Sequence, residues 1–223
     1  MTTIGNGFGR LQVAWRLKAA LTLGLTLFFC AGYFGLQQVR FFPPHPLGFW
    51  WPDRWAGFDP GWVWVYQSIY LLLPVAPWLA ASEEELRRYA RGFVGLSLAS
   101  FAVFVLFPVE SPRPMERVEG NAIYNLLTSY EGRLNAFPSL HAGLIAYAVL
   151  FGERISRGWP SRGARRGLLA GMTLWGAAIL YAALAVKQHY FVDFPAGAAL
   201  AWASHRIAWR PSGERDVFSR VTG

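Results

Sequence analysis

The sequence predicts an all-α integral membrane protein, a bundle of six helices with both termini in the cytoplasm. Of its 223 residues 54% are hydrophobic and only 15% are charged, whereas soluble domains usually carry about 25% charged residues. The apolar residues gather in charge-free windows, and a helix needs roughly 20 residues to cross a bilayer. Basic residues are concentrated in alternate connections between these windows, which is typical of membrane proteins.

The spans follow from the charge-free windows in chain order. They are expected to be helical because lipid offers no partner for open backbone groups. We expect spans at about 17–37, 61–81, 91–109, 138–153, 167–187 and 191–208. The last has the shortest window, residues 194–205, and it crosses only if Asp193 lies in its first turn. The first is interpreted as a retained helix rather than a cleaved signal peptide, because no small-x-small site follows it.

The distribution of charge predicts the orientation. The N-terminus, the second and fourth connections and the tail hold 15 of the 21 Lys and Arg residues, and the other connections hold 6. The richer side is expected to be cytoplasmic. The net charge of +8 therefore reflects topology, and we expect no nucleic-acid partner. The chain is a single domain, 1–223, and its one cysteine, Cys30, excludes an internal disulfide.

Two connections carry local signals. Ser82 and Glu85 fit a capping box, so the third helix is expected to begin in the cytosol before it enters the lipid. The first outer connection, 40–62, is rich in Trp, which suits the lipid headgroup layer. We favour an aromatic belt there over a lip for substrate entry.

Three polar clusters lie beside the spans, where ionisable groups are costly and indicate function. They are Arg113-Pro114 after the third span, Pro138-Ser139-Leu140-His141 at the start of the fourth, and residues 187–193 between the fifth and the sixth. Because successive connections alternate sides, all three clusters share one side. The charge count makes that side the outer one.

The chemistry of these residues suits phosphoryl transfer. His189 and Asp193 are four apart and would share a helix face, so the carboxylate can hold one imidazole nitrogen as N–H and leave the other free to attack. Pro138 suits the first turn of a helix, whose N–H groups, with the Ser139 hydroxyl, bind anions. His141 would be an acid or base beside them.

Two basic residues could bind the phosphate, and each residue of the three clusters also has a purely structural explanation. Arg113 offers a planar fork for phosphate oxygens, and Lys187 offers a second cation. Each residue also has a plainer explanation: an interface arginine at Arg113, a simple helix start at Pro138-Ser139, a satisfied bundle histidine at His141, a structural or metal-binding pair at His189 and Asp193, and a snorkelling anchor at Lys187. Their convergence at one surface favours a site that requires no metal. We interpret His45 as a loop residue and His205 as a residue of the cytoplasmic end.

The motifs, which span 113–193, resemble those of the type 2 phosphatidic acid phosphatase superfamily, and the six-span layout would extend the match over most of the chain. The resemblance implies that His189 is the nucleophile that forms a phosphohistidine, that Asp193 orients it, and that His141 is the general acid and then the base. It also implies that the phosphate is held by Arg113, Ser139, Lys187 and nearby backbone N–H groups, Leu140 among them. No cofactor and no metal are implied.

The chain departs from the family pattern at several positions. Leu106 replaces the first-motif lysine, Leu140 replaces the usual glycine, and Ala182 and Ala183 replace a Ser-Arg pair. The forms Pro-Ser-Leu-His and Lys-Gln-His-Tyr are similar to the branch of inositol phosphorylceramide synthases and bacterial relatives. An alcohol could then replace water as the acceptor.

The leading prediction is therefore a lipid-phosphate phosphatase or phosphotransferase in a bacterial inner membrane, with its site facing the periplasm. Its partners would be a membrane lipid phosphate and the bilayer, and the oligomeric state stays open. Three alternatives remain: a phospho-headgroup transferase, a small non-enzymatic lipid or ion transporter, and a metal hydrolase that uses His141, His189 and Asp193.

Overall fold

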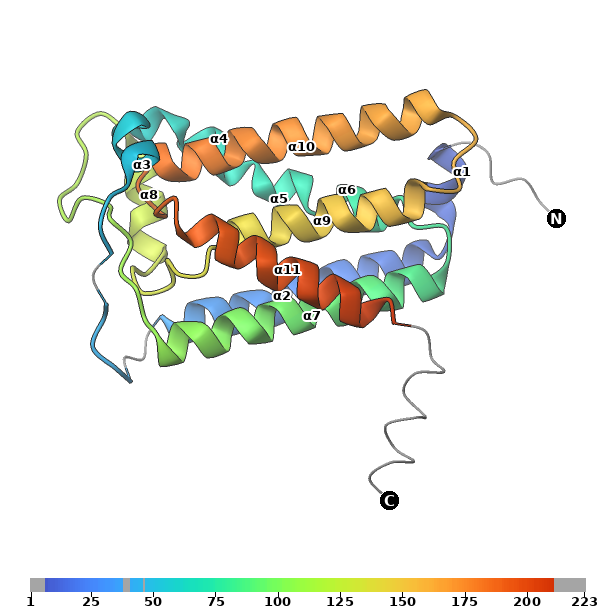
Figure 1. The fold of residues 1–223 in the computed structure, drawn as a ribbon, viewed down its shortest axis with the longest axis horizontal. Helices are drawn as coiled ribbons and strands as arrows, with labels where there is room; N and C mark the ends of the chain where they lie inside the picture. The colour runs from blue at the N-terminus through green and yellow to red at the C-terminus, as the bar shows by residue number, and fades with distance from the viewer. Residues whose placement is uncertain (1–6, 38–40, 46, 211–223) are drawn as a thin grey trace, which may run out of the picture.

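The computed structural model describes residues 7–37, 41–45 and 47–210, which form helices and loops without a β-strand (Figure 1). The all-α prediction is confirmed for this part of the chain. Its elements are α1 (Gly7–Gln12), α2 (Trp15–Leu36), α3 (Trp51–Trp55), η1 (Pro60–Trp62), α4 (Val63–Gln67), α5 (Ile69–Leu72), α6 (Val75–Trp78), α7 (Glu83–Leu106), α8 (Ala122–Tyr130), α9 (Leu140–Ser156), α10 (Arg162–Ala185) and α11 (Asp193–Ala208).

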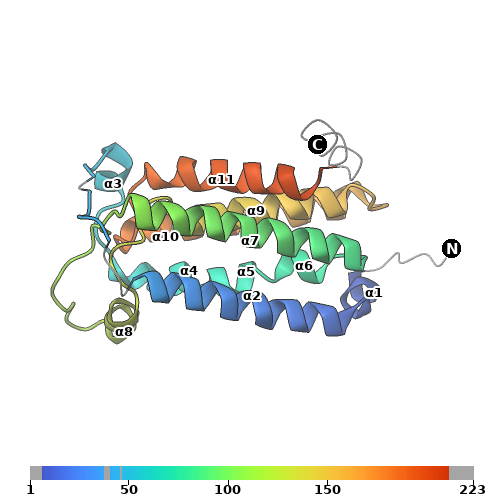
Figure 2. The same cartoon turned by 90° about the horizontal axis from the view of Figure 1, so that it is seen from below.

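The long helices lie side by side along the molecule, with α3 and α8 at one end and α1 at the other (Figures 1 and 2). We call these ends the α3/α8 end and the α1 end. Helices α2, α7 and α10 run toward the α3/α8 end, and the segment α4–α6, α9 and α11 run away from it. Helices α7 and α10 therefore finish, and α9 and α11 start, at the α3/α8 end. The three polar clusters of the sequence therefore lie at the same end of the bundle.

Three of the described helices, α2, α7 and α10, are long and apolar enough to cross a membrane. They have 22, 24 and 24 residues, whereas α9 and α11 have 17 and 16. Large apolar side chains on the outside of these helices, such as Leu23 and Leu174, are exposed. This surface is consistent with an integral membrane protein, since such exposed apolar area suits lipid contact.

The segment 61–81 was expected to be one continuous helix, and the structure corrects this. It consists of the last part of η1 followed by α4, α5 and α6, which lie one after another along the bundle. Pro74 and Pro77 explain part of the interruption, because proline lacks the N–H that a helix interior needs. The start of α7 agrees with the sequence: Glu85 N donates to Ser82 Oγ at 3.2 Å.

Helix α9 lies at the centre and packs against α7, α10 and α11. Its first turn meets that of α11 at a glycine, Gly197, where a Cβ atom would lie 2.1 Å from the Ser139 carbonyl oxygen. A side chain at this position would collide with the backbone of α9. The glycine thus lets the starts of α9 and α11 meet at the α3/α8 end.

Candidate active site

Three loop segments lie alongside one another at the α3/α8 end. His45 N donates to Pro108 O at 2.8 Å, and Ala136 N donates to Val109 O at 3.2 Å. Ser111 N donates to Arg133 O at 2.7 Å. These bonds attach the segment after α7, which carries Arg113, to the segment before α9, which leads to His141.

His189 lies in the loop 187–193 between α10 and α11, which we call the catalytic loop, and is 3% exposed. Its Nδ1 lies 2.9 Å from the Ala136 carbonyl oxygen. Because a carbonyl can only accept, this contact assigns the proton to Nδ1 and leaves a lone pair on Nε2 of the neutral ring. Nε2 lies 3.2 Å from Nδ1 of His141. The structure therefore brings together the two histidines that the sequence singled out.

Asp193 is fully buried and begins α11. Its Oδ2 lies 3.4 Å from His189 Nδ1 and accepts a hydrogen bond from Tyr190 N at 2.8 Å. The sequence analysis expected His189 and Asp193 to share a helix face. This expectation was wrong, because the helix starts only at Asp193 and His189 precedes it. The pair meets instead through a turn, closed by a 3.0 Å bond from Asp193 N to Tyr190 O.

His141 lies in the first turn of α9. Ser139 is the N-cap and its Oγ accepts from Ala142 N at 3.2 Å, so Pro138 precedes the cap instead of lying in the first turn. The Ser139 hydroxyl hydrogen stays available for donation, since Oγ acts as an acceptor in that bond. Ser139 N also donates to Asp193 O at 3.1 Å, which joins the two helix starts.

Arg113 is 6% exposed and lies beside the catalytic loop. Its Nη1 donates to Gln188 Oε1 at 3.4 Å, and its Nη2 donates to the Glu131 carbonyl oxygen. Arg133, which the sequence analysis did not single out, donates to Arg113 O at 2.8 Å and to Ser111 O at 3.1 Å. The guanidinium of Arg113 is thus held next to the residue that precedes His189.

Lys187 and Leu140 are placed differently from Arg113. Lys187 adopts a left-handed conformation (φ 58°) just after α10, where glycine is usual. Its Nζ donates to the Asp53 carbonyl oxygen at 2.7 Å, so this bond points toward α3. Leu140 is the first residue of α9, and its side chain is buried in the core. Only its backbone N–H faces the end of the helix.

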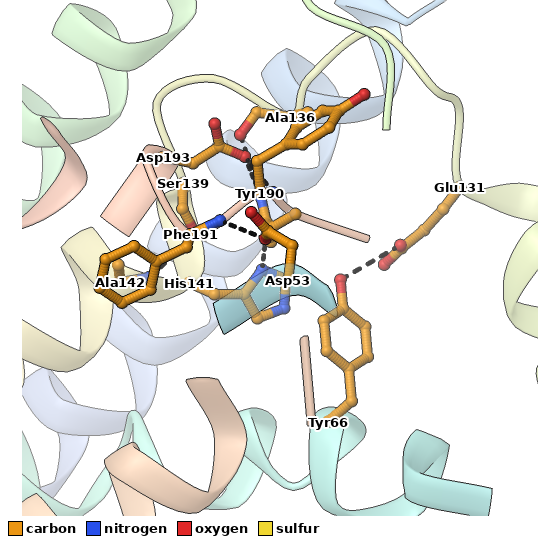
Figure 3. A network of polar contacts seen from close by, with 11 residues as sticks. Asp53, Tyr66, Glu131, Ala136, Ser139, His141, Ala142, Tyr190, Phe191 and Asp193 are labelled. Atoms are coloured by element: carbon orange, nitrogen blue, oxygen red, sulfur yellow. Dashed lines mark hydrogen bonds and ion pairs between the residues drawn. The ribbon is translucent and has the colours of Figure 1, made fainter. Parts of the chain in front are cut away.

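Asp53 in α3 is a residue that the sequence analysis missed (Figure 3). It is 2% exposed, and its Oδ1 and Oδ2 accept from Phe191 N at 2.7 Å and from Trp50 N at 2.8 Å. With the Lys187 bond, Asp53 connects α3 to the catalytic loop at two points. The Trp-rich connection is therefore more than an aromatic belt. The available signal was a lone acidic residue within an aromatic stretch.

Glu131 and Tyr66 form a second buried pair that the sequence analysis missed. Tyr66 OH donates to Glu131 Oε2 at 3.3 Å (Figure 3), and the Tyr66 ring stacks on His141 with centroids 4.4 Å apart. Burial raises the pKa of Glu131 to about 7, while Arg113 and His189 act in the opposite direction. This pair depends on tertiary contacts between α4 and the loop after α8, which no local motif indicates.

An apolar cavity of about 160 Å³ extends from the site along the bundle, and we call it the apolar groove. It is bounded by α2 and by the segment of α5 and α6, with side chains of α7 and α9 also in its wall. Glu131 and His141 line one end, and Lys18 and Trp78 line the other. Lys18 Nζ donates to the carbonyls of Trp78 at 2.8 Å, Ala80 at 3.1 Å and Arg10. Its charge is thus satisfied by backbone.

The described residues include no group of three or more His, Cys, Asp or Glu side chains placed to hold a metal ion. His45 and His205 lie apart from the pair His141–His189. His45 stacks on Phe107 with ring centroids 4.1 Å apart, and His205 contacts Tyr147 and Trp209 on the far part of the bundle.

A family model described as the PAP2 superfamily matches residues 59–207, which is more than half of the chain and includes Arg113, His141, His189 and Asp193. No curated protein and no solved structure matches the chain.

Proposed function

Because the chain belongs to the PAP2 superfamily, we propose that it is a metal-independent phosphatase or phosphotransferase that acts on a lipid phosphate through a phosphohistidine. The observation that carries this proposal is the 3.2 Å contact between His189 Nε2 and His141 Nδ1. Arg113 beside the pair supplies positive charge for an anionic substrate.

In the first step, the lone pair on His189 Nε2 attacks phosphorus and the bond from phosphorus to the lipid oxygen breaks. The electron pair of that bond leaves with the oxygen, and protonated His141 donates its proton there. The His189 Nδ1–H stays on the Ala136 carbonyl, and Asp193 at 3.4 Å stabilises the positive charge that develops on the ring.

In the second step, an acceptor hydroxyl attacks the phosphohistidine. His141 takes the hydroxyl proton, the N–P bond breaks and its electrons return to His189 Nε2. The phosphate oxygens are held by Arg113, by the Ser139 hydroxyl and by the first N–H groups of α9, including that of Leu140. Lys187 adds positive charge at the edge of the catalytic loop.

The two imidazoles must separate for this chemistry. A nucleophile lies about 3–3.5 Å from the atom it attacks, and an acid lies about 2.8 Å from the oxygen it protonates. The two nitrogens then lie roughly 6 Å or more apart with a phosphate between them. In the proposed mechanism, substrate binding therefore replaces the 3.2 Å contact between the two nitrogens.

We further propose that the bundle crosses the bilayer six times, with both termini in the cytoplasm and the α3/α8 end at the outer face of a bacterial inner membrane. This arrangement is supported by the basic residues at the α1 end and by the exposed Trp50, Trp51 and Trp55 at the other end. Tryptophan favours the headgroup layer of a membrane. A lipid phosphate then enters from the outer leaflet.

The test is phosphate release from dioctanoyl phosphatidic acid by the purified protein in detergent. We expect His189→Ala to abolish release, while His45→Ala, a histidine change at the same end of the bundle, keeps it. We also expect acid-labile ³²P on the wild-type protein and none on His189→Ala. Full activity in His189→Ala would contradict the proposal, and so would complete inhibition of the wild type by EDTA.

A further inference from the structure

We propose that Glu131 and Tyr66 bind the hydroxyl group of a lipid alcohol, which accepts the phosphoryl group from His189 while its hydrocarbon chain lies in the apolar groove. This inference rests on the proposed function and concerns its second step. The hydrogen bond between the buried Glu131 and Tyr66 does not by itself imply a ligand, and the inference adds a role for both residues in binding the acceptor.

The apolar groove fits a hydrocarbon chain. Its described lining is aliphatic and aromatic along most of its length, and its charged groups are confined to the two ends. Tyr33 and Lys18 of α2 mark its extent, which is about 22 Å at 1.5 Å per residue. Lys18 is bonded to three carbonyls, so it offers no N–H to a ligand. Polar recognition of a ligand in the groove therefore falls to the end that Glu131 and His141 line.

The polar end of the groove favours a neutral hydroxyl over a phosphate. Glu131 is 5% exposed, and an ionised carboxylate there repels an anion at close range. Its Oε2 accepts from Tyr66, and its other carboxylate oxygen accepts no hydrogen bond from the residues that the structure describes. An alcohol O–H is a donor that suits this oxygen. The pKa near 7 agrees with a site where the charge of the carboxyl is poorly solvated.

The position of Tyr66 connects this hydroxyl to the reaction. Its ring stacks on His141, whose Nδ1 faces the nucleophile, and both Glu131 and His141 line the groove. A hydroxyl at Glu131 is thus beside the base of the second step. When its oxygen attacks phosphorus, its one proton turns from the Glu131 carboxylate to His141, and the electrons of the N–P bond return to His189. The products are a new lipid phosphate and the free enzyme.

The experiment measures the fate of the phosphoryl group. Purified protein in detergent is given ³²P-labelled dioctanoyl phosphatidic acid with hexadecanol, and hexadecyl phosphate and free phosphate are both counted. Glycerol, which has hydroxyls but no chain, is the matched acceptor. We expect the wild type to transfer the phosphoryl group to hexadecanol in preference to glycerol. The methyl ether of hexadecanol has no O–H to donate in a hydrogen bond, so we expect it to compete only weakly with hexadecanol.

Glu131→Gln tests the carboxylate. We expect the ratio of hexadecyl phosphate to free phosphate to fall about tenfold, because a hydrogen bond to a charged group is worth about that factor. Tyr66→Phe keeps the stack on His141 and should lower the ratio less. Glu119→Gln, the same change at an exposed position of the same end, should keep the wild-type ratio. If Glu131→Gln does not give a single peak in size-exclusion chromatography, Tyr66→Phe supplies the test.

Three results would overturn the inference. The first two are an unchanged ratio in both Glu131→Gln and Tyr66→Phe, and equal use of glycerol and hexadecanol by the wild type. Phosphate release without any hexadecyl phosphate would also overturn it, but would leave the proposed function standing. A wild-type protein that releases no phosphate from any lipid phosphate would overturn the proposed function itself.

Discussion

Both ends of the bundle collect charged and aromatic side chains, but they satisfy the charges in different ways. At the α3/α8 end Asp53, Arg113 and Lys187 are buried and bond to backbone groups. At the α1 end Lys18 is buried against backbone carbonyls, whereas Arg and Glu side chains pair with one another at the surface, as in Arg87–Glu83 at 3.3 Å. Exposed pairs contribute little to stability, whereas losing one partner of a buried charge is costly.

The contacts of the aromatic residues also differ between the two ends. At the α1 end, the guanidinium groups of Arg88 and Arg154 lie 5.1 and 4.8 Å from the Trp209 ring, a pairing that tolerates solvent. At the α3/α8 end, Tyr66 stacks on His141 and also donates to Glu131. The aromatic ring there orients polar groups. Changes at the α3/α8 end should therefore alter activity, and changes at the α1 end should alter it little.

The largest effect is expected for His141→Ala. We expect kcat on dioctanoyl phosphatidic acid to fall about 10²–10⁴-fold, which is the usual contribution of a general acid or base. With p-nitrophenyl phosphate the fall should be smaller, because its leaving group departs without a proton. Equal losses on both substrates would contradict the role of His141 as the acid.

Asp53→Asn should give the next largest effect. An amide offers one acceptor where the carboxylate accepts from both Phe191 N and Trp50 N, so one backbone N–H loses its partner. We expect kcat to fall about 10²-fold through misplacement of the catalytic loop, with a smaller change in KM. Asp59→Asn is the control, an exposed acid in the same connection. Wild-type kcat in Asp53→Asn would show that the connection to α3 does not position His189.

A smaller effect is expected from pH. Burial raises the pKa of Glu131 to about 7, so the carboxyl is protonated below that pH and ionised above it. Arg113 and His189 oppose the shift, and the phenols of Tyr33, Tyr66 and Tyr70 also face this carboxyl. Since the ionised form accepts a hydroxyl better, transfer to hexadecanol should rise between pH 6 and 8. In Glu131→Gln this rise in the ratio of transfer to hydrolysis should disappear; its persistence would exclude Glu131 as its cause.

The smallest effect is expected at the α1 end. Glu83→Gln removes an exposed pair with Arg87, in which both side chains are more than half exposed. We expect a change in the free energy of unfolding of about 0.5 kcal/mol or less and no change in kcat. Thermal unfolding in detergent and the phosphatase assay would measure both. A large loss of activity would show that the two ends are coupled.

The sequence was sufficient to predict the helical class. It also singled out His141, His189, Asp193 and Arg113, which the structure brings to one end of the bundle, because each lies in a short motif beside an apolar window. The break in the segment 61–81 was not predicted, because the charge-free window indicates the length of an apolar segment and not whether its helix is continuous. The shared helix face of His189 and Asp193 could not be checked, because it depends on where α11 begins.

The supporting residues were out of reach for a different reason. Asp53 meets Phe191, and Glu131 meets Tyr66, across long separations along the chain. Contacts between residues so far apart cannot be deduced from a single sequence. A lone acidic residue in a loop is usually solvated. Only the contact of α3 with the catalytic loop, and that of Tyr66 in α4 with Glu131, show that these two carboxylates are buried.

The close contact at Gly197 determines how the active site can open. With the starts of α9 and α11 in backbone contact and joined by the bond from Ser139 N to Asp193 O, the helices cannot move apart without breaking that junction. In the proposed mechanism the two imidazoles therefore separate by rotation about their side-chain bonds, while the two helix starts stay joined.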